Sequence, residues 1–279
     1  MQCPLGILEE PAAAKVRTFA AANHLYIEAV VKPPRDESDI ARFDAELATA
    51  VSVGALAART TVIPGRRYEY FDSLEMFNEY AARARRMLEL AAPVAEKHRM
   101  PIAVENHKDQ RNDERLALFE HIDSEYVGAC MDTGNSFALL EDPVQTVRDF
   151  APWTHSVHLK DQALQLYDDG FLLADIPLGQ GGLDLKAMVA VLRKAKPDIR
   201  FSLELITRDP LKVTCLTEKY WATFSTLPAR DLARTLRYVR EHSSDNLQYI
   251  SRMTLDEQLA REDANVRESL EYARDELGL

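Results

Sequence analysis

PIAVENH (residues 101–107) and VGACMDTGNS (residues 127–136) are the two segments that decide the predicted fold. Each contains a short apolar run that ends in a carboxylate, Glu105 in the first segment and Asp132 in the second. A helix is expected between them, over about residues 113–121. Because a strand, a helix and a second strand in this order are typical of a parallel α/β unit, both carboxylates should lie at the carboxyl end of a strand.

The same arrangement recurs twice further along the chain. SVHLKD brings His158 to the end of a third apolar run, and RFSLELI brings Glu204 to the end of a fourth. The four positions are 27, 26 and 46 residues apart, and each interval fits a strand, a crossover helix and loops. In a parallel barrel these strand ends meet at one mouth. Two Glu, one Asp and one His would form an oxygen-rich set of ligands for a divalent cation there.

The composition is that of an ordinary globular protein. A chain of 279 residues that is 46% hydrophobic and 28% charged can bury a sizeable core. The formal net charge of −11 argues against a nucleic-acid partner, whose phosphates need a basic surface. There is no apolar run of about 18 residues, so no membrane span is expected. Three widely spaced cysteines and an N-terminus unlike a signal peptide favour a cytoplasmic protein.

Hydrophobic periodicity and breakers place the remaining elements. Helices are expected over 11–22, 38–57 and 73–97, and strands over 24–31 and 58–63, with a weaker strand at 5–9. Pro93 should kink or end the third of these helices. Residues 161–182 end in several glycines and are expected to form a long connection at the barrel mouth.

The strand count predicts an incomplete barrel. Six clear strands and the weak one make seven, one βα unit fewer than a closed (β/α)₈ barrel needs. We therefore expect an α/β fold: a TIM barrel over residues 1–215 that lacks its first strand, followed by a C-terminal helical extension over 216–279. Thr254 and Glu257 form a capping box in that extension. Because open sheet edges are usually covered, the extension or a second subunit should cover the gap, which favours a homo-oligomer.

Five motifs in this order resemble the sugar phosphate isomerase/epimerase superfamily, which has a xylose isomerase-like TIM barrel. They are ENH at 105–107, MDTGN at 131–135, HLKD at 158–161, LGQGGLD at 178–184 and LEL at 203–205. The resemblance spans about residues 25–215. It implies one divalent metal ion, Mn²⁺ first and Mg²⁺, Co²⁺ or Zn²⁺ as alternatives. The implied ligands are Glu105, Asp132, His158 and Glu204.

The resemblance also implies that Glu105 and Glu204 act as acid and base on either side of a bound sugar. Moving a proton next to a sugar carbonyl creates an enediolate, whose charge a divalent cation stabilises as a Lewis acid. A sugar or keto-sugar isomerase or epimerase is therefore the first expectation. The alternative is a lyase or dehydratase on a keto-sugar, keto-glycoside or inositol derivative, because it uses the same base and metal. A partner subunit that acts only in an assembly is a third possibility.

The same barrel also occurs in a trinuclear zinc endonuclease of the AP endonuclease type. That enzyme needs His where this chain has Asn135, and His at the ends of two earlier strands, where Lys32 and Ile63 stand. An Asp-x-His before the LG-x-G loop is also absent, because Leu173 and Asp175 stand there. Together with the negative charge, these departures make an endonuclease the weakest alternative.

Each ligand also has an ordinary structural reading. A strand can simply end in a solvated acid, and Asp132 can form an Asx-turn before Gly134. One His in a strand is more often a hydrogen-bonded core residue. Four such strand ends in register favour metal ligation over these readings.

Four further side chains are expected to contact substrate. His107 lies two residues past Glu105, on the same side of an extended chain. Many sugar epimerases of the superfamily carry a substrate-binding His where Asn135 stands. Lys160 could hold a substrate hydroxyl or carboxylate, or could pair with Asp161. Arg208 could bind an anionic or polyhydroxy substrate, or could be an ordinary surface residue.

Overall fold

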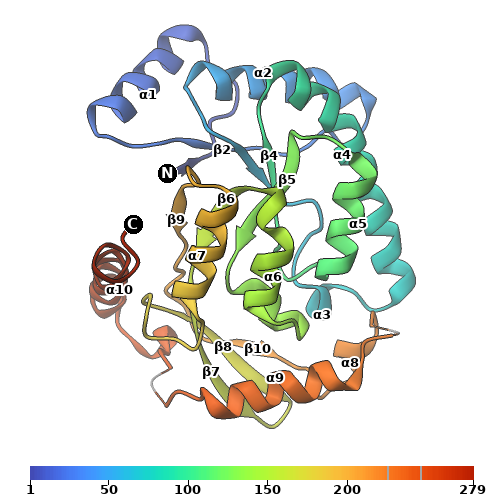
Figure 1. The fold of residues 1–279 in the computed structure, drawn as a ribbon, viewed down its shortest axis with the longest axis vertical. Helices are drawn as coiled ribbons and strands as arrows, with labels where there is room; N and C mark the ends of the chain where they lie inside the picture. Colours follow the sequence, from blue (N-terminus) through green and yellow to red (C-terminus); the bar gives the residue numbers. More distant parts are fainter. Residues whose placement is uncertain (225, 246) are drawn as a thin grey trace.

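The computed structural model describes residues 1–224, 226–245 and 247–279. Its main sheet has parallel strands in the order β1-β2-β3-β4-β5-β6-β9 and curls into a nearly closed barrel (Figure 1). The bounds of these strands are β1 Gln2–Cys3, β2 Glu28–Val30, β3 Ala58–Thr60, β4 Ile102–Glu105, β5 Val127–Asp132, β6 Thr154–Leu159 and β9 Phe201–Leu203. The predicted α/β fold and the four strands that end in candidate ligands are confirmed.

Helices cover the outside of the barrel (Figure 1). They are α1 Glu10–Ala22, α2 Ile40–Ser52, α4 Leu74–His98, α5 Asn112–Ile122, α6 Pro143–Phe150 and α7 Leu185–Ala195. On α2, Phe43, Leu47 and Ala50 recur at helical spacing and are fully buried against the sheet. The core between these helices and the strands fixes the positions of the strand ends.

The barrel is open between β9 and β1, which are the two ends of the sheet order. Side chains bridge this seam, because the Tyr26 hydroxyl donates to the carbonyl oxygen of Phe201 at 2.8 Å. A cavity of about 600 Å³ opens there, and Gln2, His158 and Glu204 are among the residues that line it. The expectation of a barrel one unit short is therefore confirmed. The weak strand expected at 5–9 is wrong, because the first described strand is Gln2–Cys3.

A second sheet lies beyond the carboxyl ends of the barrel strands (Figure 1). Its antiparallel strands are β7 Asp161–Tyr167, β8 Gly170–Ile176 and β10 Leu211–Val213. The loop expected over 161–182 is therefore mostly a hairpin. β8 is buried along its whole length and β7 over its first four residues, while Asp168 and Asp169 form the two-residue turn between them. The glycines of the predicted loop, at positions 179, 181 and 182, lie in the connection between β8 and α7.

Pro93 neither ends nor divides its helix, since α4 runs unbroken from Leu74 to His98. A proline inside a helix removes one backbone hydrogen bond and strains the preceding turn. Leu88, Ala91 and Ala95 are fully buried on either side of it. The burial of both halves of α4 in the core outweighs the free-energy cost of the proline. The sequence pattern gives no measure of that burial.

Within the described ranges, three helices follow the second sheet: α8 Glu218–Trp221, α9 Ala229–Glu241 and α10 Leu255–Glu276. The short turn η4 Ile250–Arg252 lies between α9 and α10. Earlier in the chain, short 3₁₀ or helical turns lie at η1 Glu37–Asp39, α3 Arg67–Tyr70, η2 Asn135–Leu139 and η3 Ala151–Trp153. The Ser269 hydroxyl on α10 accepts from the Leu178 N–H at 3.2 Å, so this helix packs on the barrel. The predicted capping box at Thr254 is present. Within the described ranges, no helix combines the length and apolarity that a membrane span requires.

Candidate metal centre

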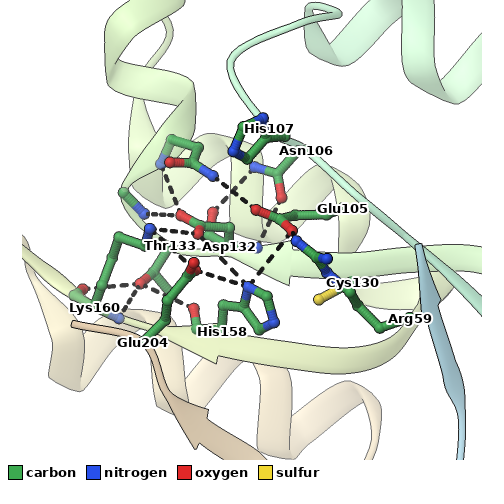
Figure 2. A network of polar contacts seen from close by, with 12 residues as sticks. Arg59, Glu105, Asn106, His107, Cys130, Asp132, Thr133, His158, Lys160 and Glu204 are labelled. Carbon is green, nitrogen blue, oxygen red and sulfur yellow. Dashed lines mark hydrogen bonds and ion pairs between the residues drawn. The ribbon is translucent and has the colours of Figure 1, made fainter. Parts of the chain in front are cut away.

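The four predicted ligands meet at the carboxyl ends of β4, β5, β6 and β9 (Figure 2). One ligand atom from each of Glu105, Asp132, His158 and Glu204 lies within 4.8 Å of the others. Strand register brings them together, because Asp132 lies opposite His158, and the Glu204 N–H continues the ladder by donating to the Leu159 carbonyl at 3.0 Å. Residues far apart in sequence therefore form one compact cluster.

Three buried atoms of the cluster make no hydrogen bond of acceptable geometry. They are Asp132 Oδ2, His158 Nδ1 and Glu204 Oε2. They crowd each other, since His158 Nδ1 is only 2.8 Å from Glu204 Oε2. Buried polar atoms normally have partners, and leaving one unsatisfied costs about 1–3 kcal/mol. Three oxygens and one nitrogen that face a common point fit a divalent cation, which would satisfy all three atoms at once.

A turn aims Asp132 at this point. Its Oδ1 accepts from the backbone N–H groups of Gly134 and Asn135, both at 2.9 Å, which leaves Oδ2 toward the cluster. The Asn106 side chain holds the Asp132 backbone from both sides: it donates to the carbonyl oxygen at 3.0 Å and accepts from the N–H at 2.7 Å. The Asx-turn reading and the ligand reading of Asp132 are therefore compatible. Burial raises the pKa of Asp132 to about 6.

Gln2 orients His158. His158 Nε2 lies 2.9 Å from Gln2 Oε1, which can only accept, so Nδ1 is the ring nitrogen that faces the cluster. The Gln2 amide in turn donates to Glu28 Oε2 at 2.8 Å, and Ser156 donates to the same oxygen at 2.7 Å. The sequence analysis missed this chain of contacts. A glutamate inside the apolar run 24–31 is the signal that could have indicated it.

Replacing Gln2 with leucine is therefore expected to weaken divalent metal binding about 10- to 100-fold, because His158 loses the acceptor that fixes its orientation. The dissociation constant for Mn²⁺ would be measured by competition with a chelator. Cys3→Ser, on the same strand, is the control and should bind Mn²⁺ as tightly as the natural sequence. Unchanged affinity in Gln2→Leu would mean that packing alone orients His158.

Two basic side chains enter the cluster. Lys160 Nζ lies 2.8 Å from Asp132 Oδ2 and 3.0 Å from Glu204 Oε2. Burial opposes its charge, but Asp132 and Glu204 outweigh burial and raise the pKa of Lys160. Arg59, from β3, forms an ion pair with Glu105. Arg59 was also missed, although an arginine within the run AART at 57–60 was a detectable signal.

Asn135 and Lys160 lie directly against the cluster. The Asn135 amide donates to Glu105 Oε1 at 3.3 Å, and its oxygen accepts from Lys108. Lys160 does not pair with Asp161, which was one of its two predicted roles. Asp161 instead turns to the connection after β8, where it accepts from the N–H groups of Gly179 at 2.9 Å and of neighbouring residues.

His107 and Arg208 lie farther from the four ligands. The backbone N–H of His107 donates to Asp109 at 3.2 Å, while burial and the adjacent Lys108 lower the pKa of its imidazole to about 4, so the ring is neutral. Arg208 pairs with Asp175 Oδ2 at 3.0 Å and is only partly exposed, so the plain surface reading does not describe it. Whether these residues contact substrate stays a prediction.

Sequence comparison places this barrel in a family. The model of the xylose isomerase-like TIM barrel family matches residues 14–242. The chain belongs to this family. It is also similar to the 3-oxo-isoapionate decarboxylase of Pectobacterium atrosepticum, with 28% identity over 143 residues, which are 50% of this chain and 52% of that protein. The chain thus matches about half the length of this curated relative.

Solved structures of the same fold agree with this assignment. A D-psicose 3-epimerase from Clostridium cellulolyticum H10 superposes with a TM-score of 0.57 at 12% identity, over 84% of this chain and 83% of that chain. A xylose isomerase-like TIM barrel protein from Mycobacterium smegmatis, solved in complex with magnesium, has a TM-score of 0.54 at 18% identity. The superposition covers 82% of this chain and 80% of that chain. At these identities the likeness concerns the fold alone.

Proposed function

We propose that this chain is a divalent-metal-dependent lyase that breaks a carbon–carbon bond next to the ketone of a keto-sugar derivative. The observation that carries the proposal is the cluster of Glu105, Asp132, His158 and Glu204, whose ligand atoms lie within 4.8 Å of one another and of which three make no hydrogen bond of acceptable geometry. Mn²⁺ is the expected cation, with Mg²⁺, Co²⁺ and Zn²⁺ as alternatives. The decarboxylase similarity supports the lyase class, since a decarboxylase breaks a carbon–carbon bond.

The two glutamates are not equivalent, which also supports a lyase. Glu105 is fully buried and is neutralised by Arg59, with Asn135 on its other oxygen. The Glu204 side chain is 24% exposed at the seam cavity. An epimerase that uses opposite faces of one carbon needs two carboxylates free to move a proton. Glu204 pairs with Lys160, which can supply a proton, whereas Glu105 pairs with an arginine, which stays protonated. A lyase needs only one such group to protonate the new carbanion.

The residues around the cluster have different roles in the proposed reaction. A divalent cation, when bound, supplies Lewis-acid stabilisation of the negative charge that develops on the ketone oxygen. When the carbon–carbon bond breaks, its electron pair moves to that oxygen. Lys160, buried beside Asp132 and Glu204, adds a fixed positive charge near it. The Lys160 ammonium, 3.0 Å from Glu204 Oε2, then gives a proton to the carbon through Glu204.

An isomerase or epimerase is the second candidate. Glu105 and Glu204 reach the cluster from different strands, β4 and β9, and the chain would need only to free Glu105 from Arg59. Cytoplasmic location and a homo-oligomer are further predictions that accompany either reaction.

Incubating the Mn²⁺-loaded chain with keto-sugars and keto-sugar acids in deuterium oxide separates the two candidates. A lyase is expected to give a shorter product that carries deuterium at the cleaved carbon, seen by mass spectrometry. Deuterium in an unshortened product would instead favour the isomerase or epimerase. Glu204→Gln should slow either reaction about 10²–10⁴-fold.

A further inference from the structure

The strand ends hold more positive side chains than the metal cluster requires. Besides Arg59 at Glu105, there are Lys160 at the cluster, Lys108 at Asn135 and Arg208 at Asp175. Gln162 links them, because its amide donates to Asp175 Oδ1 at 2.6 Å and its side chain lies, like that of Lys160, against Gly134. The next residue, Asn135, accepts from Lys108. Lys108, Lys160 and Arg208 therefore share one region at the mouth of the barrel.

A count of formal charges shows that positive charge exceeds negative charge at the strand ends once a divalent cation is bound. The acidic side chains in this region are Glu28, Glu105, Asp132, Asp175 and Glu204, and the basic ones are Arg59, Lys108, Lys160 and Arg208. Five acids against four bases leave one negative charge, so a bound divalent cation would leave one uncompensated positive charge in a mostly buried site. Uncompensated buried charge is costly, and a neutral sugar would leave it. A carboxylate on the substrate would cancel it.

Lys108 is the least satisfied of the three cations. It is 4% exposed, and its ammonium carries three donors, yet among the described residues its hydrogen-bond acceptor is the Asn135 amide oxygen. Its backbone has φ +61°, a left-handed conformation that is unfavourable for lysine. The Arg67 N–H donates to its carbonyl oxygen at 2.9 Å and holds it there. Strain and a buried, under-bonded charge at one residue are typical of a functional position.

We propose that Lys108, Lys160 and Arg208 form a subsite for a carboxylate, and that the substrate is a keto-sugar acid whose carboxylate lies β to the ketone. This inference rests on the proposed lyase function and names its substrate class. The bond that breaks joins the carboxylate carbon to its neighbour, and CO₂ leaves. The electron pair moves to the ketone oxygen as an enolate, and a proton then adds to the carbon. No oxidant or reductant is needed.

The charge of Lys108 gives the subsite a pH dependence. Burial and Lys160 lower the pKa of Lys108 to about 8, against the opposing effects of Asp132 and Asp175, while Arg208 adds to the lowering. Above that pH the free enzyme loses the ammonium charge. kcat/KM for an acidic substrate is therefore expected to fall as pH rises through about 8, and this alkaline limb should be absent in Lys108→Arg.

The subsite can be tested with two matched probes, 3,4-dihydroxybutanoate and 1,2,4-butanetriol. Both offer a vicinal diol, but only the first has a carboxylate. Calorimetry on the Mn²⁺-loaded chain should show the acid binding at least about tenfold more tightly than the triol. Lys108→Met should remove this preference and leave the affinity for the triol unchanged. Lys108→Arg should keep part of the preference for the acid over the triol. Lys212→Met, at an exposed position, is the control and should keep the whole preference.

Thermal unfolding separates a binding role from a structural one. Lys108→Met removes a buried, under-bonded charge, so its Tm should be equal to or a few degrees above that of the natural chain. A lower Tm, or an acid preference that survives in this variant, would overturn the assignment of Lys108. Equal affinity for both probes in the natural chain would overturn the carboxylate subsite while leaving the metal-dependent lyase intact. A chain that binds no Mn²⁺ would fail the proposed function before either probe is added.

Discussion

Replacing Asp132 with alanine is expected to abolish stoichiometric metal binding and to lower turnover at least about 10³-fold. Asp132 Oδ2 faces the cluster, where Lys160 Nζ lies 2.8 Å away, and its other oxygen is engaged by the turn at Gly134. Removing it takes away both a ligand and part of the charge that attracts the cation. Elemental analysis after dialysis should find about one Mn, Mg, Co or Zn per natural chain and less than about a tenth of that in the variant.

Thermal unfolding adds a readout that does not depend on activity. A cation present at about 100 times its dissociation constant should stabilise the natural chain by about 2.7 kcal/mol, which corresponds to a rise of about 5–10 °C in Tm. Asp132→Ala should show no such rise. Asp168→Ala, an exposed acid in the β7–β8 turn, removes the same charge and should retain it. About three zinc ions per chain would revive the endonuclease, and metal retained in Asp132→Ala would disprove the four-ligand site.

Replacing Asp161 with alanine should cause the largest loss of stability, about 4 kcal/mol. Its buried carboxylate accepts from the backbone N–H groups of Gln162 at 2.8 Å, Gly179 at 2.9 Å, Gly181 at 3.0 Å and Leu183 at 3.2 Å. An alanine leaves these donors without their acceptor, and each unsatisfied donor costs about 1–3 kcal/mol. Burial raises the pKa of Asp161, which shows that its charge itself is unfavourable and offsets part of this stabilisation. The free energy of unfolding would be measured in urea.

Asp161→Asn provides a graded control. Oδ1 accepts from Gln162 and Leu183, whereas Oδ2 accepts from Gly179 and Gly181. Asparagine keeps one acceptor oxygen and places an NH₂ group against the other two donors, so it should lose about half as much stability as alanine. Gly181→Ala should also be destabilising, since its Cβ would lie 2.1 Å from Asp161 Oδ1. A loss below about 1 kcal/mol in Asp161→Ala would show that water replaces the carboxylate.

Local pattern was sufficient to predict the candidate metal ligands. Glu105, Asp132, His158 and Glu204 each end a short apolar run, and every run became a strand of the barrel. In a parallel barrel all strands point the same way, so the end of each run specifies the same mouth. The seven-strand count and the incomplete barrel were also predicted, although the seventh strand lies at Gln2–Cys3 and not at 5–9. The division at residue 215 stays a proposal.

Local pattern was insufficient where long-range packing decides. Pro93 should end a helix by its own chemistry, but the buried residues on both sides of it keep α4 continuous. The segment 161–176 carries turn residues that suggest a loop. It forms two strands that pair with each other along their whole length, and β10, more than 30 residues later, adds to the free edge of β8.

The sequence alone thus determined which residues end the strands, because strand periodicity and strand ends are local properties of the chain. Tertiary structure alone decided what surrounds them. Gln2 reaches His158 across 156 positions, and Arg59 reaches Glu105 from the neighbouring strand. Lys108 follows the ENH motif in what reads as a polar loop, and only its left-handed backbone turns it into the buried mouth. Contacts between distant segments depend on how the barrel closes, and no local pattern records that geometry.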